Sequence, residues 1–252
     1  MAFIPLHSWR RDAVTALLMS YPRSGSHMVR AVLEAASGRP TLGCPGNPAD
    51  TPIRDRFPPS AETPFAREAE APIAQKIHWV SEELALRRGG VEVERICLVI
   101  RDPAKCVVSQ MVRSLDEARG VSRLRQRRRM ARPGRLESML FGELAHWMAL
   151  VDRCAASDLP KLVLGFEDLV SPDGLAMVNE DLLPFFGLEH RFSDRAALDA
   201  VLAFGRESQV ARKKTLPPDV YARNARASEI VREAVDYAEV RSRLGLPPLV
   251  SD

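Results

Sequence analysis

Apolar positions along the chain fall into two patterns, short continuous runs and stretches with helical spacing. The short runs predict strands, and RICLVI at 95–100 has the unbroken apolar character of a strand in the middle of a parallel sheet. The predicted strands are 14–20, 72–78, 95–100 and 161–166. The predicted helices are 26–36, 81–88, 103–118, 137–156, 173–187 and 194–205. The repeated order of strand, loop and helix predicts an α/β fold of three layers, with helices on both faces of a parallel sheet.

Two stretches interrupt this alternation. Residues 39–72 contain eight prolines, which predicts an irregular excursion, and we expect it to lie beside a functional site. Residues 119–135 contain eight arginines and no acidic residue. The default interpretation of this Arg-rich loop is a solvated surface, and the alternative is a cover over a ligand or a surface that captures an anionic glycan or lipid headgroup. We interpret 1–252 as one domain that carries both segments.

Composition narrows the class of protein. The 36 Lys and Arg against 33 Asp and Glu leave a net charge of +3, which is too small to indicate nucleic-acid binding from bulk charge. No run approaches the ~18 apolar residues of a membrane span, so we expect a cytoplasmic protein without one. The four cysteines form no CxxC pair, which favours reduced structural thiols. No His, Asp and Glu cluster has metal-ligand spacing, so we predict no metal.

The loop SYPRSGSHM at 20–28 joins a predicted strand to a predicted helix. A glycine lets the backbone approach a ligand, the helix N-terminus is partly positive, and hydroxyls and a guanidinium bind oxyanions. A phosphate is therefore the expected occupant, although an ordinary serine-capped turn uses the same residue types. The Walker pattern of kinases and GTPases is missing, because Ser26 stands where its lysine belongs. The groups expected at the phosphate are Arg23, Ser24, Gly25, Ser26 and His27.

Two motifs together resemble the sulfotransferases that use 3′-phosphoadenosine 5′-phosphosulfate (PAPS). YPRSGS at 21–26 resembles the family loop that cradles the 5′-phosphosulfate. Arg101-Asp102-Pro103, with Ser109 eight residues after the arginine, resembles the motif that grips the 3′-phosphate. An arginine at a strand end and a serine about two helical turns later can converge on one phosphate.

Further matches extend the resemblance over most of the chain. Lys76-Ile77-His78 is similar to the family segment whose histidine is the base, and Phe166-Glu167-Asp168-Leu169 is similar to a segment near the adenine. LPFFGL at 183–188 resembles the helix that follows it. Arg212-Lys213 resembles the segment that closes on the 3′-phosphate.

The resemblance implies an in-line transfer of a sulfuryl group from PAPS to a hydroxyl or amine without a metal. His78 would take the proton, while Arg23 and Lys76, with Ser26, would stabilise developing charge. Arg23 replaces a family lysine, which favours electrostatic stabilisation over proton donation. His27 and Met28 replace a threonine and an adenine-stacking tryptophan, Phe166 replaces a tyrosine, and Lys214 stands where the family has glycine.

Other classes of function remain open on the sequence alone. The chain could be a non-catalytic module that binds a nucleotide or nucleic acid, although the arginines of 119–135 lack interleaved aromatic residues. A small-molecule P-loop kinase is disfavoured by the missing lysine. The expected partners are PAPS, its product 3′-phosphoadenosine 5′-phosphate (PAP) and an acceptor, for which an anionic compound is one interpretation. Neither the acceptor nor the oligomeric state follows from the sequence.

Overall fold

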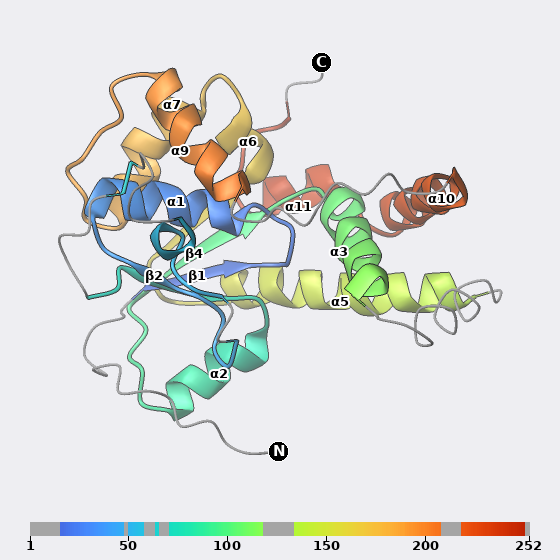
Figure 1. Cartoon of the computed structure of the whole chain (residues 1–252). Helices are drawn as coiled ribbons and strands as arrows, with labels where there is room; N and C mark the ends of the chain where they lie inside the picture. The colour runs from blue at the N-terminus through green and yellow to red at the C-terminus, as the bar shows by residue number, and fades with distance from the viewer. Residues whose placement is uncertain are drawn as a thin grey trace.

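The centre of the molecule is a sheet of five parallel strands in the order β2-β3-β1-β4-β5 (Figure 1). The computed structural model describes residues 16–47, 50–57, 64–65, 71–117, 134–207 and 218–249. The strands are β1 (Ala16–Ser20), β2 (Thr41–Leu42), β3 (Ala74–Ile77), β4 (Arg95–Ile100) and β5 (Lys161–Gly165). The predicted α/β class with a parallel sheet between helices is confirmed.

The order of the strands places β1 at a switch point of the sheet. After β1 the chain builds β2 and β3 on one side, and β4 and β5 follow on the other side. Both neighbours pair with β1 in register, so that Met19 lies opposite Ile77 of β3 and Leu98 of β4. In open α/β sheets the ligand crevice lies beyond the carboxyl ends of the strands at such a point. The loops after β1, β3 and β4 meet there.

Helices cover both faces of the sheet, and each face has its own hydrophobic cluster. Strand residues alternate between the clusters, because successive side chains point to opposite faces: Leu18 packs in one cluster and Leu17 in the other. One face carries α1 (Ser26–Ser37), α6 (Phe166–Val170), α7 (Gly174–Met177), η2 (Val178–Leu182), α8 (Leu183–Phe185) and α9 (Arg195–Glu207). The other carries α2 (Val80–Arg88), α3 (Pro103–Glu117), α5 (Arg135–Ala155), α10 (Pro218–Ala234) and α11 (Tyr237–Arg243).

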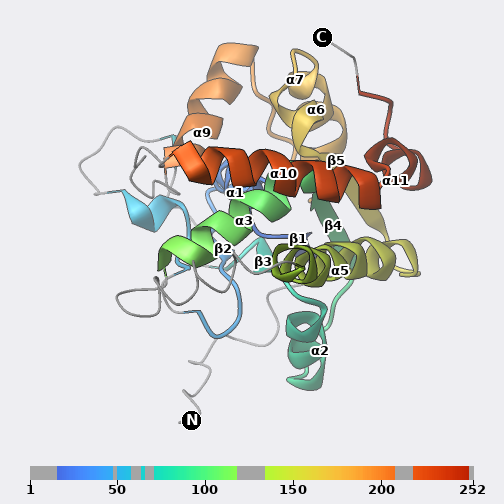
Figure 2. The ribbon, with the colours of Figure 1, turned by 90° about the vertical axis from the view of Figure 1, so that its right-hand side faces the viewer.

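Close packing of helices sets the shape around the loop after β1. α1 lies against α9, where a Cβ at Gly205 would come within 2.5 Å of the Met28 Cα. On the opposite face α10 lies across α3 (Figure 2). The apolar residues of α10 that reach this cluster are Ala227, Ile230 and Val231.

Several predicted elements differ from the observed ones. The predicted helix at 173–187 is divided into α7, the π-helical η2 and α8, and Pro184, which cannot donate a backbone hydrogen bond, lies in α8. Residue 166 begins α6 instead of ending a strand. The sequence reasoning predicted neither α10 nor α11, and it predicted no regular structure in the excursion, which contains β2 and the short helix η1 (Arg54–Arg56). In the described part of the chain, no helix has the length and apolar character to cross a membrane.

Candidate active site

The loop between β1 and α1 has a strained backbone that opens a helix N-terminus. Arg23 has a φ of 71° and Gly25 a φ of 90°, so both adopt the left-handed conformation that non-glycine residues rarely enter. Ser24 N donates to Tyr21 O at 3.2 Å and closes the turn. No described side chain caps α1 at Gly25. The backbone amides at the start of α1 therefore form a partly positive end that suits an anion.

Gly25 is in contact with Phe166, which begins α6 after β5. A Cβ at Gly25 would lie 2.4 Å from Phe166 Cδ2, so a larger residue cannot fit without displacing the ring. The Arg101 guanidinium lies over the same ring, 4.3 Å from its centroid, in a cation–π contact. Phe166 therefore contacts both the loop and the arginine of the RDP motif.

The two phosphate-type motifs touch one another. Arg101 Nη1 donates to the backbone oxygen of Arg23 at 2.9 Å. Arg23 Nε donates to Ser109 Oγ at 3.1 Å. The left-handed conformation of Arg23 thus brings its carbonyl to the end of β4, while its side chain reaches α3. Arg23, Arg101 and Ser109, separated by up to 86 positions in the sequence, lie at one edge of the sheet.

His78, directly after β3, is held so that the lone pair of its ring lies on Nε2. Its Nδ1 lies 2.6 Å from the backbone oxygen of Ser20, and a carbonyl can only accept, so Nδ1 carries the proton. The lone pair of a neutral ring is then on Nε2. Burial, followed by the charge of Lys76, lowers the pKa of His78 to about 3, which keeps the ring neutral. Its backbone N–H donates to Glu82 Oε2 at 2.6 Å.

Lys76 lies in a buried cluster of charged groups. Its Nζ is 2.8 Å from Asp50 Oδ2 and 3.4 Å from His27 Nε2. Burial lowers the pKa of Lys76, and the carboxylate of Asp50 opposes that effect. Burial also lowers the pKa of His27 to about 2, with further contributions from Lys76 and Arg30, so His27 is a neutral ring among cations. Sequence reasoning missed Asp50, whose only signal is its place in the proline-rich excursion.

Glu167 and Asp168, in the segment that resembles the adenine-side motif, form hydrogen bonds with other elements. Glu167 Oε1 accepts from the backbone N–H of Asp102 at 3.2 Å, and its Oε2 accepts from Tyr237 Oη at 3.0 Å. Asp168 accepts from Arg241 Nη2 at 2.9 Å on both carboxylate oxygens. These bonds connect β5 and α6 to the RDP motif and to α11.

The predicted residues divide into three groups by position. Arg23, Gly25, Arg101, Ser109 and Phe166 make the contacts between the two motifs. His27, Lys76 and His78 form the adjoining side of the site. Ser24 lies in the loop and Ser26 is the first residue of α1, and both residues are buried.

The predicted 3′-phosphate contacts Arg212 and Lys213 lie outside the described residues, as does most of the Arg-rich loop. No protein-family model matches the chain, and a search of curated proteins finds no match. The functional assignment therefore depends on the motifs and on the geometry that brings them together.

Proposed function

We propose that this protein is a sulfotransferase with a P-loop-like sulfotransferase fold that transfers a sulfuryl group from PAPS to a hydroxyl or amine. The observation that carries the proposal is the chain of contacts from Arg101 through Arg23 to Ser109. A donor with phosphates at both ends needs two cationic sites a short distance apart, and these contacts supply them on adjacent strand ends. An ordinary serine-capped turn would not require contacts with the RDP motif and Ser109.

The proposed role of each group follows from its position at the strand ends. The amides of the first turn of α1 and the guanidinium of Arg23 bind the sulfated end of PAPS. Arg101 and Ser109 bind the 3′-phosphate and orient the donor. Phe166 keeps Arg101 and Gly25 in place by direct contact, which supports a positioning role beside the adenosine.

In the transfer step, His78 Nε2 accepts the proton of the acceptor hydroxyl while that oxygen forms a bond to sulfur. The bond from sulfur to the 5′-phosphate oxygen breaks, and its electron pair leaves with PAP. Arg23 stabilises the negative charge that develops on the leaving phosphate, and Lys76 stabilises the charge on the transferred sulfuryl group. Without the donor, burial and then the charge of Lys76 lower the pKa of His78 to about 3. An anionic donor opposes the charge of Lys76 and raises that pKa, which makes the ring a better base.

A transfer assay tests the proposal. Labelled sulfate from PAPS is offered to phenols, sugars, amines and lipids, and the product is measured for the wild type and for His78→Ala. We expect the variant to lose about 10²–10⁴-fold in rate, the usual contribution of a general base. His146→Ala is the matched control, because His146 is exposed on α5 and packs edge-on against Trp79 at 4.9 Å. Full activity in His78→Ala would contradict the assignment of the base.

Binding separates this proposal from a nucleic-acid-binding module. Calorimetry with PAP is compared with calorimetry on single-stranded oligonucleotides of several lengths. A sulfotransferase binds PAP and shows little affinity for the oligonucleotides. The reverse preference would favour a nucleic-acid-binding module, whose affinity should fall steeply with salt.

A further inference from the structure

The carboxylate of Asp50 lies beside the candidate site and accepts hydrogen bonds from three cationic side chains and one backbone amide. Its Oδ1 accepts from Arg30 Nη1 at 2.7 Å and from Arg56 Nη2 at 2.8 Å. Its Oδ2 accepts from Lys76 Nζ at 2.8 Å and from the backbone N–H of Cys44 at 2.9 Å. Burial alone would raise the pKa of Asp50, but the charges of Lys76 and Arg30 hold that pKa well below its usual range. Asp50 is therefore a permanent anion in this structure.

The three cations around Asp50 are not held equally. Arg30 is fully buried, and it also donates to Thr41 Oγ1 at 2.7 Å and to Thr51 O at 2.7 Å. Arg56 likewise donates to Thr51 O at 3.1 Å. Within the described part of the chain, Lys76 Nζ contacts the carboxylate of Asp50 and, at a longer distance, the ring nitrogen Nε2 of His27. Lys76 is thus the cation that can leave Asp50 with the smallest loss of other bonds.

Asp50 also keeps enough partners when Lys76 leaves. The remaining donors are two guanidinium groups and one backbone amide, so its charge stays compensated. Lys76, in contrast, is 3% exposed and needs an anion, because a buried unpaired ammonium is costly. That anion can be Asp50 or an incoming ligand.

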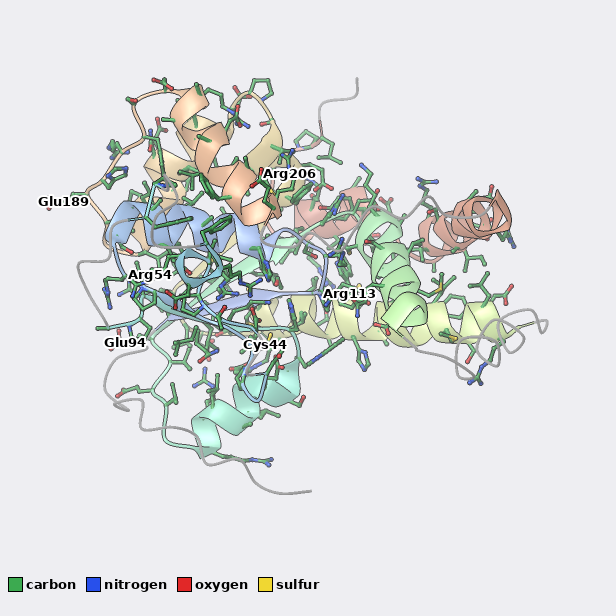
Figure 3. The ribbon with its side chains drawn as sticks, in the orientation of Figure 1. Cys44, Arg54, Glu94, Arg113, Glu189 and Arg206 are labelled. Carbon is green, nitrogen blue, oxygen red and sulfur yellow. The ribbon has the colours of Figure 1, made fainter. Side chains whose placement is uncertain are left out.

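The location of Lys76 indicates which incoming anion could replace Asp50 as its partner. Its ammonium lies beside the ring of His27, the second residue of α1, whose amide end would hold the sulfated end of the donor. Lys76 also lies two residues before His78, which directly follows β3, and its charge contributes to the lowered pKa of His78 after burial. Figure 3 labels Cys44, whose backbone N–H donates to Asp50.

We propose that Asp50 is a positioning residue that serves as a resident counter-ion for Lys76, and that Lys76 exchanges this carboxylate for the sulfuryl oxygens when PAPS binds. The inference rests on the proposed function. Asp50 competes with the sulfuryl group for one ammonium and so lowers the affinity for PAPS. It has no such effect on PAP, which lacks the sulfuryl group.

The test compares the dissociation constants of PAP and PAPS, measured by calorimetry without acceptor. Asp50→Asn keeps the shape of the side chain and removes the competing charge. We expect the ratio of the PAP constant to the PAPS constant to rise about tenfold in this variant, as for the loss of one charge-assisted contact. Asp55→Asn is the matched control: it removes a charge from the same segment, but its side chain is 47% exposed and pairs with Arg54 at 3.8 Å. The control leaves the ratio unchanged.

A second variant keeps the inference testable if Asp50→Asn fails to fold. Lys76→Met removes the exchanging ammonium, and we expect the same ratio to fall about tenfold because PAPS loses a contact that PAP never makes. An unchanged ratio in either folded variant overturns the role of Asp50 and leaves the sulfotransferase proposal standing. Failure of the wild type to bind either nucleotide overturns the proposed function itself, and the inference with it.

Discussion

Substitution of Gly25 by alanine tests whether the phosphate-type loop has a single allowed geometry. Gly25 has a φ of 90°, where an L-residue is strained, and its missing side chain leaves room for the ring of Phe166. The added Cβ would lie 2.4 Å from Phe166 Cδ2 and 2.9 Å from Cε2. The variant therefore meets two separate penalties, one from the backbone and one from the ring.

The two penalties can be measured apart. Gly90 has a φ of 82°, and a Cβ built there meets no described atom within 4 Å, so Gly90→Ala carries the backbone cost alone. We expect about 1–2 kcal/mol of lost unfolding free energy in Gly90→Ala. Gly25→Ala should lose a further 1–3 kcal/mol, roughly the cost of overpacking a filled space. Urea unfolding of both variants measures the difference.

A compensating change identifies the contact responsible. Phe166→Ala removes the ring that the new methyl group meets, so the extra loss caused by Gly25→Ala should largely disappear when it is measured in the Phe166→Ala background. Equal unfolding free energies for Gly25→Ala and Gly90→Ala would refute the reasoning, since the ring would then impose nothing on the loop. An undiminished cost of Gly25→Ala in the Phe166→Ala background would show that the strain lies elsewhere.

Three further predictions concern a hydrogen bond, an ion pair and the protonation of His78 around the site. Tyr237→Phe removes the bond from Tyr237 Oη to Glu167, and it should cost about 1 kcal/mol of unfolding free energy in urea. Asp168→Asn breaks an ion pair with the buried Arg241 and should cost more, up to about 3–5 kcal/mol, in the same assay. Because the folded-state pKa of His78 is lowered to about 3, its neutral ring contributes stability that is complete above about pH 6.5 and is lost as the pH falls toward 3. His78→Gln should reduce that acid dependence, which is measured as the change of unfolding temperature with pH across this range. An unchanged slope of unfolding temperature against pH would contradict the low pKa of His78.

The chemical character of the loop at 20–28 could be predicted from the sequence. A buried parallel strand needs an unbroken apolar run, and a phosphate-type loop needs a glycine, hydroxyls and a cation within a few positions of that strand. Both requirements are local, so β1, β4 and the loop at 20–28 could be predicted from composition and order alone. The spacing of Arg101 and Ser109 is local as well, because a helix sets it.

Other features depend on contacts between distant segments. Asp50 pairs with Lys76, which is 26 positions away in the sequence, and with Arg30, which is 20 positions away. No pattern within the excursion marks that carboxylate. The two-residue strand β2 exists because β3 offers it backbone partners. α10 is held by the face that α3 and α5 present to it.

The sequence by itself determined the parallel α/β class and the chemical groups after β1, β3 and β4, since periodicity and short motifs act within a few residues. Only the tertiary structure decided which groups meet. It brought the carbonyl of Arg23 to Arg101, the ring of Phe166 to Gly25 and the carboxylate of Asp50 to Lys76. The physical reason is that hydrogen bonds and ion pairs depend on distances of a few ångströms, which for distant residues are set by the order and register of the strands.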